Sequence, residues 1–276
     1  MPLVKDSRYR PPFYLFNGHL QTIVPSLLRE VPDLQYRRQR VETTDGDFLD
    51  LDWARTEHPT DSLTIISHGL EGDAGRPYVR GMARALNQAG LDALAWNYRS
   101  CSGEPNRLLR AYHLGDTDDL HFVVQEALRT GRYRHVFLTG FSAGGNMTLK
   151  YLGEDAGRVP REVERAAVFS VPTDLKAGSE HISRLENRIY LNRFLKSLRQ
   201  KIRQKAQMLP GQLSVEGLEE LIDFPQFDDR YTAPLHGFKS ADEYYERSSS
   251  GRYLDGIRIP TLIVNAQNDP FLPPAC

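Results

Sequence analysis

Short apolar segments and helix-period segments alternate along most of this chain. The apolar segments are rich in β-branched residues and lie at residues 63–67, 91–98, 135–139, 163–171 and 259–266. Between the first four of them, apolar residues recur at helical spacing at residues 78–88, 120–129 and 146–152. This alternation predicts a mostly parallel sheet with helices on both faces, the doubly wound α/β class.

Three other segments do not follow this alternation. Residues 41–44 and 48–53 flank Asp45-Gly46, which predicts a hairpin at an antiparallel edge of the sheet. Residues 1–34 are rich in aromatic and aliphatic residues but contain several prolines, so we expect a segment that covers apolar surface. Residues 174–250 contain no convincing strand and predict a helical cap inserted into a single α/β domain, residues 1–276.

The predicted cap is divided by charge. Residues 184–205 hold eight basic residues and one acid, whereas residues 212–229 hold six acids and no base. The apolar residues of the basic part fall at helical spacing: Leu185, Ile189, Leu195, Leu198 and Ile202. We expect this helix to turn its apolar stripe to the sheet and to pair with its acidic neighbour. The alternative is peripheral contact of the cap with an anionic membrane or lipid surface.

A strand, a tight turn and a helix follow one another without a spacer at residues 135–153. Gly140-Phe141-Ser142-Ala143-Gly144 forms the turn, and Gly153 is expected to end the helix. This pattern predicts a nucleophile elbow, in which a strained serine projects its hydroxyl above the sheet. Ser142 is therefore the candidate nucleophile.

The strand at residues 63–67 leads into His68-Gly69-Leu70, where an oxyanion loop is expected. The candidate oxyanion donors are the backbone amides of Leu70 and Ala143. His68 is interpreted as a hydrogen-bonding residue that shapes the loop and not as the catalytic base. The acids at residues 116–119 are interpreted as helix-capping groups that require no metal.

Asp269 follows the last apolar strand. In parallel sheets, catalytic groups gather at the carboxyl ends of strands, so Asp269 is expected on the same rim as Ser142. An acid at this point fits the chain order Ser, Asp, His.

Composition and charge exclude several classes of protein. A net charge of −1 argues against nucleic acid as the main partner. The two cysteines, Cys101 and Cys276, cannot form a disulfide framework, and no Cys/His spacing resembles a zinc site. The N-terminus has no basic region followed by an apolar one, as a signal peptide would, and no apolar run is long enough for a spanning helix. We therefore expect a cytoplasmic protein, or at most one peripheral to a membrane. The oligomeric state stays open.

Several stretches together resemble the YheT-like branch of the α/β-hydrolase superfamily. They are FNGHLQTI, HGLEGD with RPYVRG, NYRSCSGEPNR, GFSAGGN, and TAPLHGF through to NAQNDPFLP. The resemblance implies an α/β-hydrolase fold with a helical cap, Ser142 as nucleophile, Asp269 as the acid and no cofactor or metal. It also implies a serine esterase acting on a small-molecule carboxylic ester, of short, medium or lipid-like acyl chain.

The histidine of the family triad follows one further strand, whereas this sequence ends seven residues after Asp269. All eight histidines precede Asp269: His19, His58, His68, His113, His121, His135, His181 and His236. We therefore expect the chain to lack the histidine base, the last strand and the last helix, and to be weakly active or inactive. His236 is the first candidate for a substitute base.

Three interpretations of the chain's end stay open: a truncated form, a fragment or a pseudo-enzyme. Two functions also remain as alternatives to ester hydrolysis. One is acyl transfer to an alcohol, which differs only in the group that deacylates the enzyme. The other is a non-catalytic binding protein that keeps the pocket.

Overall fold

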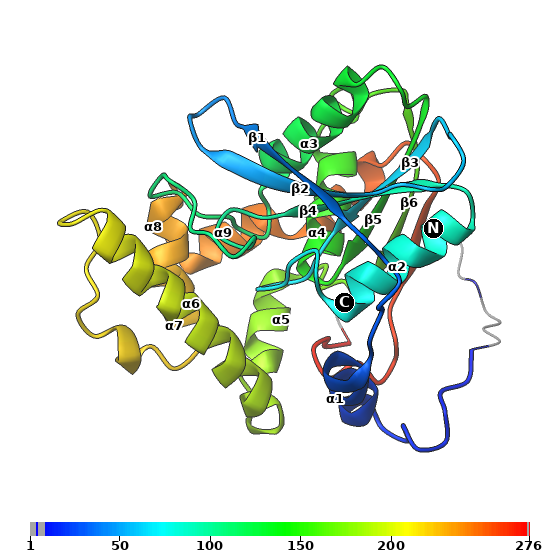
Figure 1. Ribbon diagram of the computed structural model, residues 1–276. Helices are drawn as coiled ribbons and strands as arrows, with labels where there is room; N and C mark the ends of the chain where they lie inside the picture. Colours follow the sequence, from blue (N-terminus) through cyan, green and yellow to red (C-terminus); the bar gives the residue numbers. More distant parts are fainter. Residues whose placement is uncertain (1–3, 5–8, 275) are drawn as a thin grey trace.

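In the described part of the chain, seven strands form one mixed sheet (Figure 1). The computed structural model describes residue 4, residues 9–274 and residue 276. The strand order is β1-β2-β4-β3-β5-β6-β7; β1, β2 and β4 are antiparallel neighbours, and the remaining pairs are parallel. The strands are β1 (Arg37–Glu42), β2 (Phe48–Ala54), β3 (Ser62–Ser67), β4 (Asp92–Asn97), β5 (His135–Phe141), β6 (Val163–Phe169) and β7 (Thr261–Val264).

Helices cover both faces of this sheet, which confirms the predicted doubly wound architecture (Figure 1). They are α2 (Pro77–Gln88) on one face and α3 (Thr117–Arg129) and α4 (Ala143–Glu154) on the other. In β4, Leu94 and Trp96 belong to the core under α3 and α4, whereas Ala93 and Ala95 belong to the core under α2. Small alanines on that face let α2 lie close to the strands.

The predicted hairpin is present as β1 and β2 and turns at Asp45-Gly46. Strand β1 begins at Arg37, four residues before the predicted start, because Arg38 and Arg40 form ion pairs with Asp52 and Asp50 of the neighbouring strand. These cross-strand pairs stabilise a strand whose own residues are mostly exposed.

Gly153 does not end α4, which was the sequence prediction. The helix continues to Glu154, and Gly153 lies where a Cβ atom would come within 2.0 Å of the Tyr253 carbonyl oxygen. The residue is therefore required for the close approach of η4 (Ser250–Gly256), a short helix that packs along α4. Glycine is therefore needed here for contact with a residue 100 positions later in the chain, and not to end the helix.

The 174–250 segment is helical, as predicted, and lies to one side of the sheet (Figure 1). Its helices are α5 (Leu175–Ile182), α6 (Arg188–Met208), α7 (Phe224–Phe227), α8 (Ala233–Leu235) and α9 (Ala241–Ser248). Shorter turns connect them: η1 (Leu185–Asn187), η2 (Leu218–Glu220) and η3 (Asp228–Thr232).

The expected pairing of basic and acidic parts of this segment is correct for only a few residues. Arg199 and Arg203 form ion pairs with Glu219. Lys201 instead binds Glu71 at 2.7 Å. Lys205 donates hydrogen bonds to carbonyl groups of the 99–110 loop.

The apolar stripe of α6 is also divided. Leu195 and Ile202 are buried, as expected. Leu185 and Ile189, which were predicted to face the sheet, are 81% and 67% exposed. The first turn of α6 also contributes Tyr190 and Leu191 to the core, so Leu185 and Ile189 lie on the outer side of these turns.

The N-terminal segment covers apolar surface only in part, and residues 1–3 and 5–8 of the predicted covering segment lie outside the described residues. Val31 and Leu34 are buried against α2. The helix α1 (Gly18–Leu28) contains no fully buried residue, and Phe16 is 78% exposed.

The acids at residues 116–119 lie at the beginning of α3, as predicted, but their carboxylates bind arginines and do not cap the helix amides, contrary to the prediction. The Asp116 side chain makes no capping hydrogen bond and binds Arg110 at 2.7 Å. Asp119 accepts two hydrogen bonds of 2.7 Å from Arg99. In the described residues no group of acids, histidines and cysteines is arranged to hold a metal ion.

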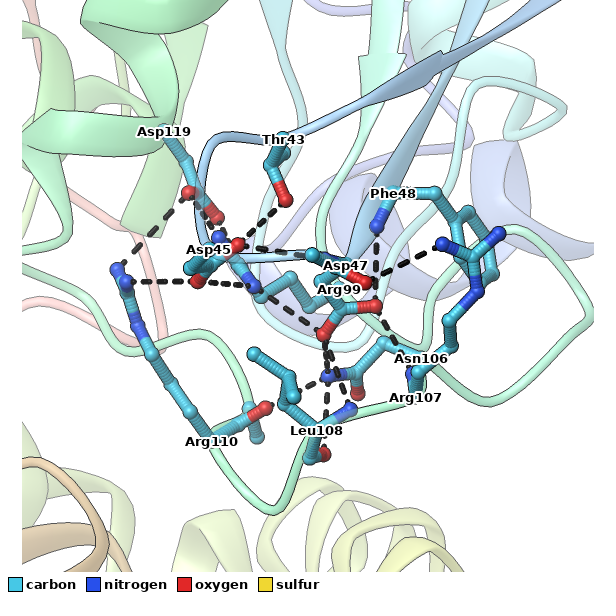
Figure 2. A network of polar contacts seen from close by, with 12 residues as sticks. Thr43, Asp45, Asp47, Phe48, Arg99, Asn106, Arg107, Leu108, Arg110 and Asp119 are labelled. Atoms are coloured by element: carbon cyan, nitrogen blue, oxygen red, sulfur yellow. Dashed lines mark hydrogen bonds and ion pairs between the residues drawn. The ribbon is translucent and has the colours of Figure 1, made fainter.

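The Asp119 ion pair belongs to a buried polar network that joins the β1–β2 hairpin to the 99–110 loop (Figure 2). Asp47 lies at its centre and accepts hydrogen bonds from Arg99, Asn106 and the backbone amide of Arg107. Because Asp47 and Arg99 are almost fully buried, their charges need partners, and Arg99 pairs with both Asp47 and Asp119. The network fixes the loop that leads to the pocket residues Tyr112 and His113.

Strand β7 pairs only with β6 in the described part of the chain, so it is an edge strand. Its residues Leu262 and Val264 are exposed, as expected for an unpaired apolar edge. Among the described residues, no helix is both long and apolar enough to cross a bilayer.

Candidate active site

Ser142 lies at the turn between β5 and α4, in a backbone conformation that serine rarely adopts. Its φ is 53° and its ψ is −117°. Its amide donates to the Phe169 carbonyl at 2.8 Å, and its carbonyl accepts from the Asn146 amide at 3.0 Å. These two bonds hold the strained turn between β6 and the first turn of α4.

The glycines on either side of Ser142 are required by close backbone contacts. A Cβ atom on Gly140 would come within 2.4 Å of the Gly144 carbonyl oxygen. One on Gly144 would come within 2.4 Å of the Ser67 carbonyl oxygen at the end of β3. Only glycine at both positions allows the elbow to lie against the β3 loop, as the sequence predicted.

The loop after β3 presents one free amide beside the elbow. The Gly69 amide donates to the Tyr78 hydroxyl at 2.8 Å, and the Glu71 amide donates to the Tyr112 hydroxyl at 3.0 Å. Between them, the amide of Leu70 has no hydrogen-bond partner in the described part of the chain. The same is true of the Ala143 amide, at the first position of α4.

His68 shapes this loop from a fully buried position. The Tyr98 amide donates to its Nε2 at 3.3 Å, so its Nδ1 carries the proton and donates to the Gly69 carbonyl at 2.8 Å. Burial lowers the pKa of His68 to about 3. Both ring nitrogens are occupied, which agrees with the loop-shaping role expected from the sequence.

Glu71 connects the loop to α6, a contact that the sequence did not indicate. Its φ of 53° turns the side chain inward, where its carboxylate accepts from the Tyr112 hydroxyl and Lys201, both at 2.7 Å. The Ser197 hydroxyl donates to the other carboxylate oxygen. Burial lowers the pKa of Lys201, but Cys101 and Glu71 raise it by more, so the net shift is upward. Lys201 therefore stays charged beside Glu71.

Ser142 lines a small cavity of about 110 Å³ between the sheet and the 174–250 segment. Leu70 and Ala143 line the same cavity, opposite apolar residues of the helical segment such as Ile182, Phe194 and Leu198. A larger cleft of about 630 Å³, lined by charged residues such as Lys150 and Glu154, does not include Ser142. The small apolar cavity is therefore the site at which the serine can meet a substrate.

One acid of the 174–250 segment also lines this cavity. Asp228 was counted with the acids expected to face the basic helix, but it is half-buried and accepts hydrogen bonds from Thr232 and from the Tyr245 hydroxyl at 2.7 Å. Burial raises the pKa of Asp228 to about 6. No local sequence pattern marks this position, because only the fold of η3 and α9 brings Asp228 to the cavity.

In the part of the chain that the structure describes, none of the eight histidines forms a hydrogen bond or an ion pair with Ser142 or Asp269. His236, the first candidate for a substitute base, lines the larger cleft, and its ring nitrogens lie 2.7 Å and 3.1 Å from the carbonyl oxygens of Thr232 and Ala111. His236 is therefore not among the residues that line the cavity of Ser142, whereas His113 is. Burial, with nearby His236, lowers the pKa of His113 well below its ordinary value.

Asp269 lies in the turn after β7, half-buried. Its carboxylate accepts from the Phe271 amide at 2.9 Å. Phe271 and Leu272 line the cavity of Ser142, so the turn borders the cavity although Asp269 itself is not among its lining residues.

Comparison with known proteins agrees with this geometry. A family model described as the alpha/beta hydrolase fold matches residues 65–275. YheT of Escherichia coli, named as a candidate esterase, is 35% identical over 262 residues, which cover 93% of this chain and 76% of YheT. The chain belongs to the YheT-like α/β hydrolases.

Two further matches are consistent with this family. A mouse protein named phospholipase ABHD3 is 28% identical over 280 residues, which cover 99% of this chain and 67% of that protein. The structure of an acylaminoacyl peptidase of Pyrococcus horikoshii superposes with a TM-score of 0.53 at 15% identity, covering 85% of this chain and 32% of the peptidase. The second likeness concerns the fold alone. By family resemblance, the YheT-like chain is a carboxylic ester hydrolase.

Proposed function

We propose that this YheT-like hydrolase cleaves carboxylic esters through an acyl-enzyme on Ser142. The observation that carries the proposal is the presence of a strained serine and two unpartnered amides, of Leu70 and Ala143, around one apolar cavity. The serine oxygen attacks the ester carbonyl, and the two amides donate to the oxyanion that forms. The alcohol then leaves, and water releases the acyl group.

Asp269 is assigned the role of orienting the triad histidine. The turn that holds Asp269 borders the cavity through Phe271. Burial raises the pKa of Tyr190 on α6, and the negative charge of Asp269 raises it further. Residues 1–276 contain no histidine after Asp269. We therefore propose that the base of the triad is not supplied by these residues and that proton transfer limits their activity.

The cavity supports an apolar acyl chain as the group bound beside Ser142. Phe194, Leu198 and Phe224 line it from the 174–250 segment, so an alkyl chain would be removed from water against aromatic and aliphatic surface. Ester substrates with a lipid-like acyl chain fit this lining better than charged ones.

The test uses a fluorophosphonate probe, which forms a covalent bond with an activated serine. We expect slow labelling of the 276-residue chain at Ser142 and none in Ser142→Ala. An enzyme that has lost its triad base still accelerates the reaction about 10³- to 10⁴-fold over water, because substrate binding and the oxyanion donors remain. Hydrolysis of p-nitrophenyl butyrate should be correspondingly slow and should also disappear in Ser142→Ala.

Two results would contradict parts of this proposal. Labelling that persists in Ser142→Ala would remove Ser142 from the mechanism. Fast stoichiometric labelling of the wild-type chain would show that a base is present, and His113→Asn would then test the histidine that lines the cavity. A folded chain that binds ester analogues without any labelling would favour the non-catalytic binding protein.

A further inference from the structure

Helix α1 and the beginning of α6 lie near each other at one end of the molecule (Figure 1). Several large apolar side chains of these segments are exposed. Phe16, just before α1, is 78% exposed, and Leu27 and Leu28 at its end are exposed as well. Leu185 of η1 and Ile189 at the beginning of α6 are 81% and 67% exposed. Single exposed apolar residues are common, but a group of this size marks a contact site.

The two helices are joined to each other at this end. His19 of α1 stacks on Tyr190 of α6 with ring centroids 5.8 Å apart, and His19 Nδ1 lies 3.0 Å from the Tyr190 hydroxyl. Ile23 of α1 packs against the apolar cluster under α6. The exposed side chains nearest this contact are Phe16, Leu185 and Ile189, and we call them and the adjoining parts of the two helices the α1–α6 surface; Leu27 and Leu28 lie at the other end of α1.

Basic residues accompany the exposed apolar ones. Arg184, Arg188, Arg193 and Lys196 are exposed, and none forms an ion pair within the described residues. Glu186 is the one acid in residues 184–205. Further along the helix, the basic side chains are held by Glu71, Glu219 or backbone carbonyls. The unpaired cations are thus concentrated beside Leu185 and Ile189.

We propose that the α1–α6 surface binds the interface of an anionic lipid bilayer. Exposed aliphatic and aromatic side chains enter the boundary between headgroups and acyl chains, while arginines and lysines at the same level bind anionic headgroups. The positive charge is local, because the chain as a whole has a net charge of −1. This charge pattern favours a lipid surface over a second copy of the chain, because the cations of two identical surfaces would repel each other.

The position of this surface also suits the proposed reaction, and this step rests on the proposed function. Tyr190 and Phe194, on the inner side of the same turns of α6, contact Phe271 with ring centroids 4.8 Å and 6.3 Å away. Phe194 and Phe271 line the cavity of Ser142. A bilayer bound at this surface would therefore lie one helix thickness from the catalytic cavity.

The experiment is co-sedimentation with vesicles of phosphatidylcholine alone, or of two parts phosphatidylcholine to one part phosphatidylserine. We expect binding to the anionic vesicles that weakens as salt is raised. Each cation near such a surface contributes about fivefold in affinity, so Arg188→Gln/Arg193→Gln should reduce binding roughly 30-fold. Leu185→Ser/Ile189→Ser should reduce binding to both kinds of vesicle.

Two matched variants serve as controls. Arg199→Gln/Arg203→Gln removes the same charge from the same helix, but both side chains already bind Glu219, so binding should be largely retained. Ile222→Ser changes an exposed apolar residue elsewhere in the 174–250 segment and should have little effect. Equal losses in the control and test variants would overturn the proposal, because binding would then reflect overall charge.

Further measurements distinguish a lipid partner from a second copy of the chain, and test the surface independently of the proposed function. A dimer in solution that dissociates in Leu185→Ser/Ile189→Ser would overturn the proposal in favour of a second copy. Ser142→Ala should bind anionic vesicles as the wild type does, since Ser142 is not part of the surface. Vesicle binding without fluorophosphonate labelling would support the surface while contradicting the proposed chemistry.

Discussion

At the scale of single residues, Ser142 shows how the candidate site stores backbone strain. Its positive φ places the side chain at the rim of the sheet, where it lines the cavity. A non-glycine residue in such a conformation costs about 1–3 kcal/mol, which the surrounding fold must offset. The hydrogen bonds to Phe169 and Asn146 contribute to that compensation.

Glycine at position 142 should relieve this strain. We expect Ser142→Gly to have a free energy of unfolding about 1 kcal/mol higher than Ser142→Ala, because both lose the hydroxyl but only glycine tolerates the positive φ. Urea denaturation followed by circular dichroism measures the difference. Ser183, with an ordinary φ of −78°, is the control, and glycine should be the less stable substitution there. Equal stability of the two Ser142 variants would mean that the turn is unstrained.

At the scale of elements, the β3 loop and α6 are joined by a buried ion pair. Glu71 follows Leu70 directly, and its carboxylate binds Lys201 and receives the Ser197 hydroxyl. The position of the Leu70 amide is therefore linked to the position of the helix above the cavity. A buried charge that loses its partner is strongly destabilising, because nothing else compensates it.

Removing only one partner of this pair should cost more than removing both. We expect Lys201→Met to lower the free energy of unfolding by about 3 kcal/mol, and Glu71→Gln/Lys201→Met to recover part of that loss. Chemical denaturation of the wild type and the two variants measures these free energies of unfolding. Arg203→Met, which removes a solvent-exposed pair with Glu219 on the same helix, should change stability little. A double variant less stable than Lys201→Met would show that the pair does not act as a unit.

At the scale of the whole molecule, buried neutral histidines couple stability to pH. His68 lies between the β3 loop and the residues after β4, and burial lowers its pKa to about 3. An unfolded chain takes up a proton at this side chain below about pH 6.5, whereas the folded chain does not. Stability is therefore unaffected by His68 above pH 6.5 and falls as the pH decreases toward 3.

Between pH 7 and pH 5.5, His68 alone should lower the free energy of unfolding by about 1 kcal/mol. His113, whose pKa is also lowered by burial, adds to the same trend. Measured by urea denaturation across this range, the free energy of unfolding of His68→Gln should therefore depend less on pH than that of the wild type. Exposed His58 is the control, and His58→Gln should keep the wild-type dependence. An unchanged slope in His68→Gln would show that His68 is protonated in the folded chain.

The sequence by itself determined the features that depend on local patterns. Apolar runs of β-branched residues gave the strands, the helical periods gave α2, α3 and α4, and Asp45-Gly46 gave the hairpin. The Gly-x-Ser-x-Gly turn gave the position and the strain of Ser142. Each of these signals lies within a few residues of the structure that it specifies, so the printed sequence contains it in full.

Only the tertiary structure decided the partners of charged and polar side chains. Asp116 and Asp119 resemble helix caps in the sequence, but arginines of the 99–110 loop bind them. Glu71 and Lys201 are 130 residues apart, and Gly153 meets Tyr253 across 100 residues. Local patterns cannot show such contacts, because an ion pair or a close backbone approach depends on how distant elements are packed. The position of His113 rather than His236 at the cavity, and the exposure of Leu185 and Ile189, follow from the same packing.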